Sequence, residues 1–343
     1  MPYDVVVATR NRLDALRISL PLIVAQSAPA RRIFVIDASD DHAAVAAYCA
    51  GLAAQGAAIA AIPARARNLP AQRNQGLAAV EAEIVAFPDD DSHWFPDTAE
   101  RLLEAYAADA PGAVGGIDAL EVGENPAGDA ESAPRKSATQ RLKRMVTPWR
   151  RLIENRLAPP PFEVFAHERI AALGGGGAVV AAGLRLVETL GGFRMSFRTR
   201  AIRSVGFNET LGYAVGYATH EDKDASLRLL NAGWLLAGAP RARVFHNVHP
   251  GRRAGGFAYG FCHLFNYAYI CHREMDGSAA ARAAILPYLR HKVRLYGLRR
   301  ADAYGRDVWR GGRAALQEAA ALLAGTRERA DDAYREGCDR RLR

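Results

Sequence analysis

The sequence predicts an α/β fold in which a mostly parallel sheet is flanked by helices and followed by a helical C-terminal extension. In the first hundred residues, short apolar segments of strand length alternate with segments whose apolar residues recur at helical spacing. From about residue 250 the pattern is helical to the end. A length of 343 residues accommodates one large domain with an extension, or two domains that each bury a core.

The strands and helices predicted in the first hundred residues follow from the apolar pattern of each segment. Val5 to Ala8 is a buried strand, and apolar residues recur at helical spacing from Leu13 to Val24. The next predicted elements are a strand over 33–36, a helix over about 42–56, a strand over 59–62, a loop and helix over 68–80, and a strand over 84–87. This alternation is typical of a parallel sheet with helices on both faces.

The second half of the chain is less regular. Its predicted elements are strands over 179–197, a short helix over 201–205, a helix over 222–232, and a strand over 243–246. The segment 254–272 contains no Asp, Glu, Lys or Arg and is rich in Phe and Tyr. A membrane span is conceivable by length, but His263, Asn266 and the early glycines favour a buried or interfacial helix.

Three consecutive acids, Asp89-Asp90-Asp91, follow the apolar strand 84–87. The carboxyl ends of strands are where open α/β sheets bind ligands. Three neighbouring carboxylates cannot all stay ionised without a counter-charge, and hard oxygen ligands suit Mg²⁺ or Mn²⁺. On these residues alone, two interpretations stay open: a cation that holds a phosphorylated ligand, or a solvated loop that caps the next helix.

Six separated segments carry a resemblance to a known family. In chain order they are VVVATRNR, VIDASDD, NLPAQRNQGL, FPDDD, GGFRMSFRTRAIRSVGFNETLG and HEDKDASLRLLNAGW. Together they resemble the family 2 glycosyltransferases, which have the nucleotide-sugar-binding GT-A fold. The resemblance implies a catalytic domain over 1–250, with a nucleotide-binding half at 1–95 and an acceptor half at 96–250. It leaves 251–343 as the helical extension.

On the donor side, the resemblance implies contacts with a nucleotide sugar. The residues implied are Thr9, Arg10, Asp37, Arg73, Asp89 and Asp90, the last at the ribose. Asp91 would bind a divalent cation, Mn²⁺ or Mg²⁺, with Asp89 and His246 as further ligands and His249 close enough to replace His246. Such a cation neutralises the charge that builds on the departing phosphates. The open alternatives are a strand-end cap for Asp37, an exposed helix residue for Arg73 and a structural histidine for His246.

On the acceptor side, the resemblance implies that Gly192, Phe193, Arg194 and Met195 face the sugar or the acceptor. The attacking hydroxyl must lose a proton, which requires a carboxylate base. Asp222 is the first choice and Glu221 the second. The alternative for both is helix capping, since acids are favoured in the first turn of a helix. Asp224 matches the helix-stabilising Asp of the family.

The expected function is inverting, metal-assisted transfer of one sugar to a hydroxyl of a glycan or lipid-linked saccharide. Two departures from the family pattern bear on it. First, Ala38 stands where the family often has a second acid after the early strand, which weakens the case for uracil as the base of the donor nucleotide. Second, the Trp motif of processive polysaccharide synthases is missing, which favours the addition of a single sugar. A sugar-1-phosphate nucleotidyltransferase would carry a glycine-rich loop, which ATRNRLDAL lacks. An inactive nucleotide-sugar-binding protein is the other alternative.

Charge and cysteine content bear on location. The net charge is +8, and residues 241–343 hold 20 basic and 10 acidic residues, a net +10. A basic insertion at 124–161 is either a lid or a surface for an anionic partner. Four scattered cysteines and the absence of an export signal predict a reduced cytoplasmic compartment. We expect peripheral attachment to an anionic inner leaflet. The alternatives are Arg-rich solvated helices and a homodimer surface built from the aromatic segment. Nucleic-acid binding is not expected.

Overall fold

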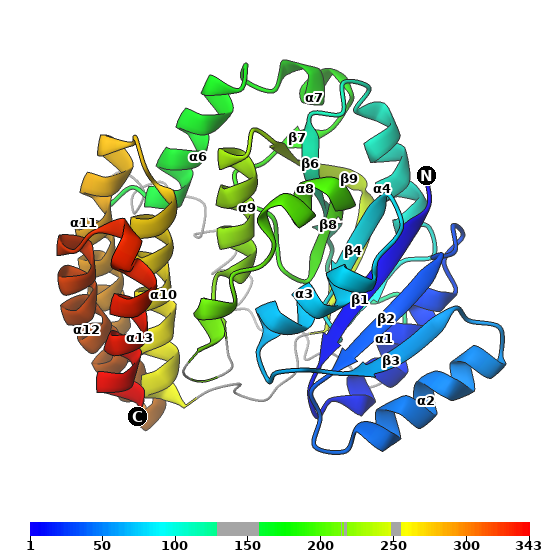
Figure 1. Ribbon diagram of the computed structural model, residues 1–343, viewed down its shortest axis with the longest axis horizontal. Coiled ribbons are helices and arrows are strands. Elements are labelled where there is room, and N and C mark those ends of the chain that lie inside the picture. The colour runs from blue at the N-terminus through cyan, green and yellow to red at the C-terminus, as the bar shows by residue number, and fades with distance from the viewer. Residues whose placement is uncertain (129–157, 214, 216–217, 248–254) are drawn as a thin grey trace. The chain divides into compact units, whose positions relative to one another are not determined.

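The computed structural model describes residues 1–128, 158–213, 215, 218–247 and 255–343 (Figure 1). The chain forms two compact units. The first comprises 1–126, 169–253 and 338–343, and the second comprises 127–168 and 254–337. The catalytic and C-terminal domains predicted at 1–250 and 251–343 stay a prediction, because compactness alone does not define where a catalytic domain ends.

A nine-stranded sheet forms the centre of the first unit, in the order β3-β2-β1-β4-β8-β6-β9-β5, with β7 also paired to β9. Strands β3, β2, β1 and β4 run parallel, and β8 lies antiparallel between β4 and β6. The strands are β1 (Tyr3–Thr9), β2 (Arg32–Asp37), β3 (Ile59–Pro63), β4 (Ile84–Pro88), β5 (Ser92–Trp94), β6 (Val114–Glu121), β7 (Arg185–Leu186), β8 (Arg194–Arg198) and β9 (Leu235–His246).

Helices flank this sheet, which confirms the predicted fold class (Figure 1). They are α1 (Leu13–Val24), α2 (His42–Ala54), α3 (Leu69–Ala79), α4 (Thr98–Ala108), α7 (Gly177–Ala181), α8 (Thr199–Val205) and α9 (Glu221–Asn231). Helix α6 (Pro161–Ala172) is divided between the two units. One prediction is wrong: 177–181 is helical, although 179–197 was expected to form strands. The apolar run is too short for its periodicity to separate strand from helix.

The parallel strands β1, β2 and β4 bring polar residues together at their carboxyl ends. The valines of β1 and all five residues of β4 are buried, as expected for strands covered on both faces. In the parallel register Thr9 lies opposite Asp37, and Ala8 bridges to Asp89. The carboxyl ends of β1, β2 and β4 therefore lie at one edge of the sheet, with Thr9, Asp37 and Asp89 side by side.

The second unit consists of helices α10 (Gly256–Glu274), α11 (Ala279–Gly297), α12 (Ala303–Ala324) and most of α13 (Ala330–Leu342). The aromatic segment lies in α10, where Phe261 and Phe265 are buried, as the sequence predicted. Helices α10 and α12 approach each other so closely that a Cβ on Gly260 would lie 2.1 Å from the carbonyl oxygen of Val308. Only glycine fits at this position. Among the described residues, no helix has the length and apolarity to cross a membrane.

Candidate active site

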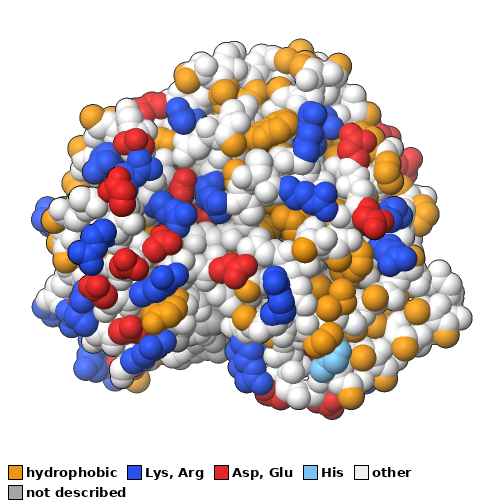
Figure 2. Space-filling view, in the orientation of Figure 1, with side chains coloured by type: hydrophobic (Ala, Val, Ile, Leu, Met, Phe, Trp, Pro, Cys, Tyr) orange, Lys and Arg blue, Asp and Glu red, His pale blue; other side chains and the backbone are white. Residues whose placement is uncertain are grey.

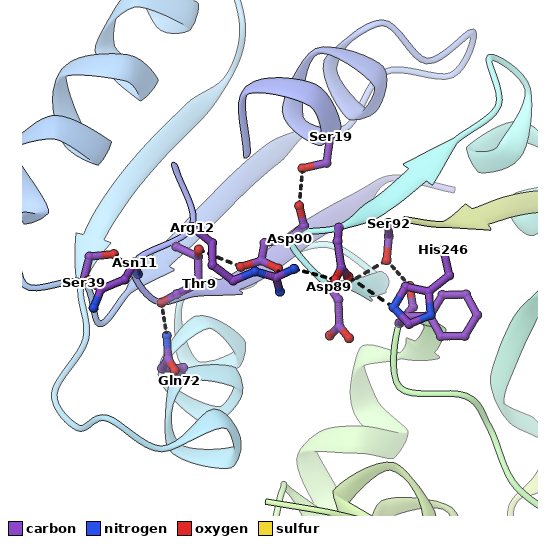
Figure 3. Close-up of polar contacts among 12 residues, drawn as sticks. Thr9, Asn11, Arg12, Ser19, Ser39, Gln72, Asp89, Asp90, Ser92 and His246 are labelled. Atoms are coloured by element: carbon purple, nitrogen blue, oxygen red, sulfur yellow. Dashed lines mark hydrogen bonds and ion pairs between the residues drawn. The ribbon is translucent and has the colours of Figure 1, made fainter. Parts of the chain in front are cut away.

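The three acids of the motif Asp89-Asp90-Asp91 occupy the turn between β4 and β5 (Figure 3). Ser92 fixes this turn, because its hydroxyl accepts the Asp89 N–H at 3.1 Å and donates to the Phe193 carbonyl at 2.7 Å. Ser19 on α1 donates to the backbone carbonyl of Asp90 at 2.8 Å. The acidic turn is therefore held from three elements rather than left as a solvated loop.

Arg12 supplies a counter-charge to two of these acids (Figure 3). Its guanidinium lies 2.5 Å from Asp90 Oδ1 and 2.6 Å from Asp91 Oδ2. Thr9 donates to the other oxygen of Asp90 at 2.8 Å. The loop that carries Arg12 turns through Asn11, whose left-handed φ of 54° is stabilised by side-chain hydrogen bonds with Asp40.

Burial and charge act differently on the two acids that Arg12 contacts. Burial raises the pKa of Asp90 to about 7, although Arg12 opposes the shift. Burial also acts to raise the pKa of Asp91, but the neighbouring His246 and Arg12 side chains outweigh it and hold that pKa well below its usual range. Asp91 therefore stays ionised, as a cation ligand requires.

Arg73 connects the acidic motif to the start of α9. It lies in the second turn of α3, whose first turn is capped by the Asn68 side chain. Although only 2% exposed, its guanidinium contacts Asp89 at 2.9 Å and Glu221 at 2.7 Å, and it donates to the Gly192 carbonyl at 3.0 Å. Arg73 is therefore not an exposed helix residue, and it brings acids 132 positions apart in sequence, Asp89 and Glu221, onto one side chain.

The pair Glu221-Asp222 begins α9 and faces the loop before β8. Asp222 accepts the Gly192 N–H at 3.0 Å and the Lys223 N–H at 2.8 Å. Burial, followed by the nearby charge of Asp222, raises the pKa of Glu221 to about 7. A carboxyl group with such a pKa exchanges a proton near neutrality.

The loop residues Gly192, Phe193 and Arg194 border the same cluster. A Cβ on Gly192 would lie 3.2 Å from Glu221 Oε1, so this position has little room for a side chain. The Phe193 ring stacks on His246 with centroids 4.2 Å apart. Arg194 instead pairs with buried Asp118 at 3.0 Å. Met195 is buried within β8, where it pairs with Phe87 and Asp118.

Two acids of the motif and His246 together form a group suited to a cation (Figure 3). Donor atoms of Asp89, Asp91 and His246 all lie within 4.8 Å of one another. His246 ends β9, and its buried Nε2 lies 3.3 Å from Asp91 Oδ1 without a hydrogen bond of ordinary geometry among the described residues. Two carboxylates and an imidazole fit Mn²⁺. His249 lies outside the described residues.

Two predicted donor-side residues lie further along the same sheet edge. Asp37 is buried, accepts the Ser39 N–H at 2.9 Å and contacts His42 Nδ1 at 2.8 Å. These contacts are those of a strand-end cap. Arg10 is exposed in the loop after β1. The basic insertion 124–161 lies largely outside the described residues, which omit 129–157.

Sequence reasoning gave Arg12 no role, although the structure places it at the centre of the acidic motif. A signal was present, because three adjacent acids need a counter-charge and the loop after the neighbouring strand carries Arg10 and Arg12. Ser92 was missed as well, since a lone serine after three acids has no distinctive pattern.

One family model matches part of the chain. Residues 4–156 match the model of glycosyl transferase family 2, which confirms the family resemblance for the four motifs that lie within this range. None of the curated proteins matches the chain.

Several solved structures have a similar fold. S. aureus TarS 1-349 in complex with UDP-GlcNAc is 15% identical, with a TM-score of 0.56 over 99% of this chain and 91% of that one. The mannosyltransferase PcManGT from Pyrobaculum calidifontis, in complex with GDP-Man and Mn²⁺, is 16% identical, with a TM-score of 0.51 over 97% and 86%. A longer S. aureus TarS structure is 13% identical with a TM-score of 0.55, and this chain covers 55% of it. These similarities establish the GT-A fold.

Proposed function

We propose that this protein transfers a single sugar from a nucleoside-diphosphate sugar to a hydroxyl acceptor, with inversion at the anomeric carbon and with the help of a divalent cation. One observation carries the proposal. The buried guanidinium of Arg73 contacts Asp89 of the cation-binding motif and Glu221 of the helix-start pair. Acids suited to a cation-bound diphosphate and acids suited to an acceptor hydroxyl therefore belong to one cluster.

On the donor side, Asp91, Asp89 and His246 would hold the cation, Mn²⁺ or Mg²⁺. When bound, that cation supplies a positive charge that stabilises the departing diphosphate. Arg12 keeps Asp90 and Asp91 oriented before the ligand arrives, since it bridges their carboxylates. Asp90 would contact the ribose, while Thr9, Arg10, Asp37 and Arg73 would line the nucleotide side.

On the acceptor side, Asp222 would act as the general base. The acceptor oxygen forms a bond to the anomeric carbon, the bond from that carbon to the phosphate oxygen breaks, and the hydroxyl proton passes to the Asp222 carboxylate. The Gly192 N–H donates to Asp222 Oδ2 and so holds the carboxylate in place. A single displacement with one base inverts the configuration. Glu221 is the alternative base.

The donor class is suggested by the similar structures, which were solved with UDP-GlcNAc and with GDP-Man. We propose a hydroxyl of a glycan or of a lipid-linked saccharide as the acceptor, presented in the cytoplasm at the inner face of the membrane. A nucleotidyltransferase would instead release pyrophosphate, and an inactive binding protein would hold donor without turnover. These outcomes are separated by product analysis.

Thermal unfolding with a panel of nucleoside diphosphates and nucleotide sugars, each with and without Mn²⁺, tests the proposal. A ligand at ~100 times its Kd adds about 2.7 kcal/mol to stability, so the donor should raise Tm strongly when Mn²⁺ is present. In Asp91→Asn the Mn²⁺-dependent part of that rise should disappear. In the control Asp276→Asn, which removes an exposed acid paired with Arg327 in the helical unit, it should persist. A panel in which no nucleotide raises Tm under either condition would contradict the proposal.

A further inference from the structure

The helical unit concentrates positive charge around the turn between α11 and α12. Residues 290–313 contain eight Lys or Arg and two Asp, a net +6. Leu298 ends α11 as its C-cap residue, and α12 begins at Ala303. Leu298 is 82% exposed, the highest value among the exposed large hydrophobic side chains of the described residues.

The basic residues of α12 share one face of the helix. Arg306, Trp309, Arg310 and Arg313 follow the spacing i, i+3, i+4 and i+7, which aligns them in one stripe. All three arginines are exposed. Trp309 packs against the end of α11, where a Cβ on Gly297 would lie 3.4 Å from the indole Nε1 of Trp309. The turn and the stripe are thus continuous. We call the set Leu298, Arg299, Arg300, Arg306, Trp309 and Arg313 the basic face.

Few acidic side chains contact the basic face. Within the part of the chain that the structure describes, Arg299, Arg300, Arg306 and Arg313 form no ion pair with a carboxylate, whereas Arg310 of the same stripe lies 3.5 Å from Asp307. The guanidinium groups of Arg300 and Arg313 lie over the Trp309 ring instead, at 4.7 and 4.9 Å from its centroid.

Elsewhere in the helical unit, basic and acidic side chains are mixed. Arg273 contacts Asp331 at 2.8 Å, and Arg335 contacts Asp332 at 3.9 Å. Figure 2 shows the same alternation of blue and red side chains over the helices on the face it draws. A concentration of one sign beside an exposed leucine is therefore specific to the basic face.

We propose that the basic face docks this protein on an anionic phospholipid bilayer. Lys and Arg side chains near such a surface are attracted to its negative potential. A leucine at the tip and a tryptophan among the cations suit the headgroup region, where amphipathic aromatic rings and apolar side chains insert. A single-stranded nucleic acid would need open aromatic faces for base stacking, and the Trp309 ring is already covered by the guanidinium groups of Arg300 and Arg313. The proposal does not depend on the chemistry assigned to the first unit.

Vesicle flotation of the full chain tests the proposal. We expect binding to phosphatidylcholine vesicles that contain phosphatidylglycerol, weakening as salt is added, and no binding to phosphatidylcholine alone. The double variant Arg306→Gln/Arg313→Gln should bind the anionic vesicles at least about tenfold more weakly. Leu298→Asp should weaken binding as well, and circular dichroism should find both variants folded.

A matched control removes the same charge from the first unit. Arg17 and Arg241 are exposed and already paired with Asp14 at 3.4 Å and Glu104 at 2.9 Å. Arg17→Gln/Arg241→Gln should bind anionic vesicles as the unaltered protein does. Equal losses in the two double variants, or equal binding to both kinds of vesicle, would overturn the proposal. Duplex DNA that binds more tightly than the vesicles and loses affinity in Arg306→Gln/Arg313→Gln would assign the face to nucleic acid instead.

Discussion

The candidate site holds two groups of carboxylates whose surroundings differ. In the turn after β4, Arg12 contacts both Asp90 and Asp91, and the side chains of Ser19 and Ser92 hydrogen-bond the backbone of the turn. At the start of α9, Glu221 shares Arg73 with Asp89, and Asp222 is held by backbone N–H groups. The first group is balanced by its own arginine, whereas the second depends on a guanidinium that belongs to both.

This difference separates two kinds of chemistry. Asp91 stays ionised because the neighbouring His246 and Arg12 side chains lower its pKa against the effect of burial. Glu221 contrasts with Asp91, since burial and the neighbouring Asp222 raise its pKa to about 7, as burial does for Asp90. A fixed anion suits a cation, and a carboxyl group that titrates near neutrality suits a place where protons move.

The largest expected effect is the loss of turnover on substituting Asp222 at the start of α9. Asp222→Asn keeps the shape of the side chain but cannot accept the acceptor proton, so turnover should fall by about 10³-fold or more. Donor binding should stay unchanged, because the turn after β4 is untouched. Calorimetric titration of the donor and assay of product formation measure the two quantities on the same preparation. Turnover that survives in Asp222→Asn and falls in Glu221→Gln would move the base to Glu221.

The next largest effect is the loss of unfolding free energy on substituting Arg73, which contacts both carboxylate groups. Arg73→Met leaves Asp89 and Glu221 without their shared cation, and breaking a buried pair from one side costs about 3–5 kcal/mol of unfolding free energy. The control is Arg67→Met, whose pair with Asp40 is exposed and should cost less than about 1 kcal/mol. Urea unfolding of the two variants measures both values. Equal losses would mean that Arg73 is no more important to stability than a surface arginine.

The parallel half of the sheet and its ligand edge could be predicted from sequence. Val5 to Val7 and the residues of β4 form unbroken apolar runs, as strands buried on both faces require. Because parallel strands end at a common edge, the residues that follow them are brought together by topology alone. The acidic turn was therefore placed correctly before any side-chain position was known.

Pairings across long separations could not be predicted in the same way. Arg73 meets Glu221 148 positions further along the chain, and which acid it reaches depends on how α3 and α9 pack on the sheet. The insertion of antiparallel β8 between β4 and β6 brings Gly192 to that cluster. Neither helix period nor strand period contains this information, because both describe a residue's own element and not its partner.

The smallest effect concerns the pH dependence of stability and tests the raised pKa of Glu221. Between its ordinary pKa of 4.5 and about 7, folded Glu221 keeps a proton that the unfolded chain has lost. The folded state then binds more protons, so unfolding free energy falls as pH rises through this window. Glu221→Gln cannot titrate and should lack this fall, which is on the order of 2 kcal/mol between about pH 5 and about pH 8. Asp90 titrates in both proteins, so its contribution cancels in the difference between the two curves. Urea unfolding across this range without added metal measures the difference. Parallel curves would mean that Glu221 ionises at its ordinary pKa.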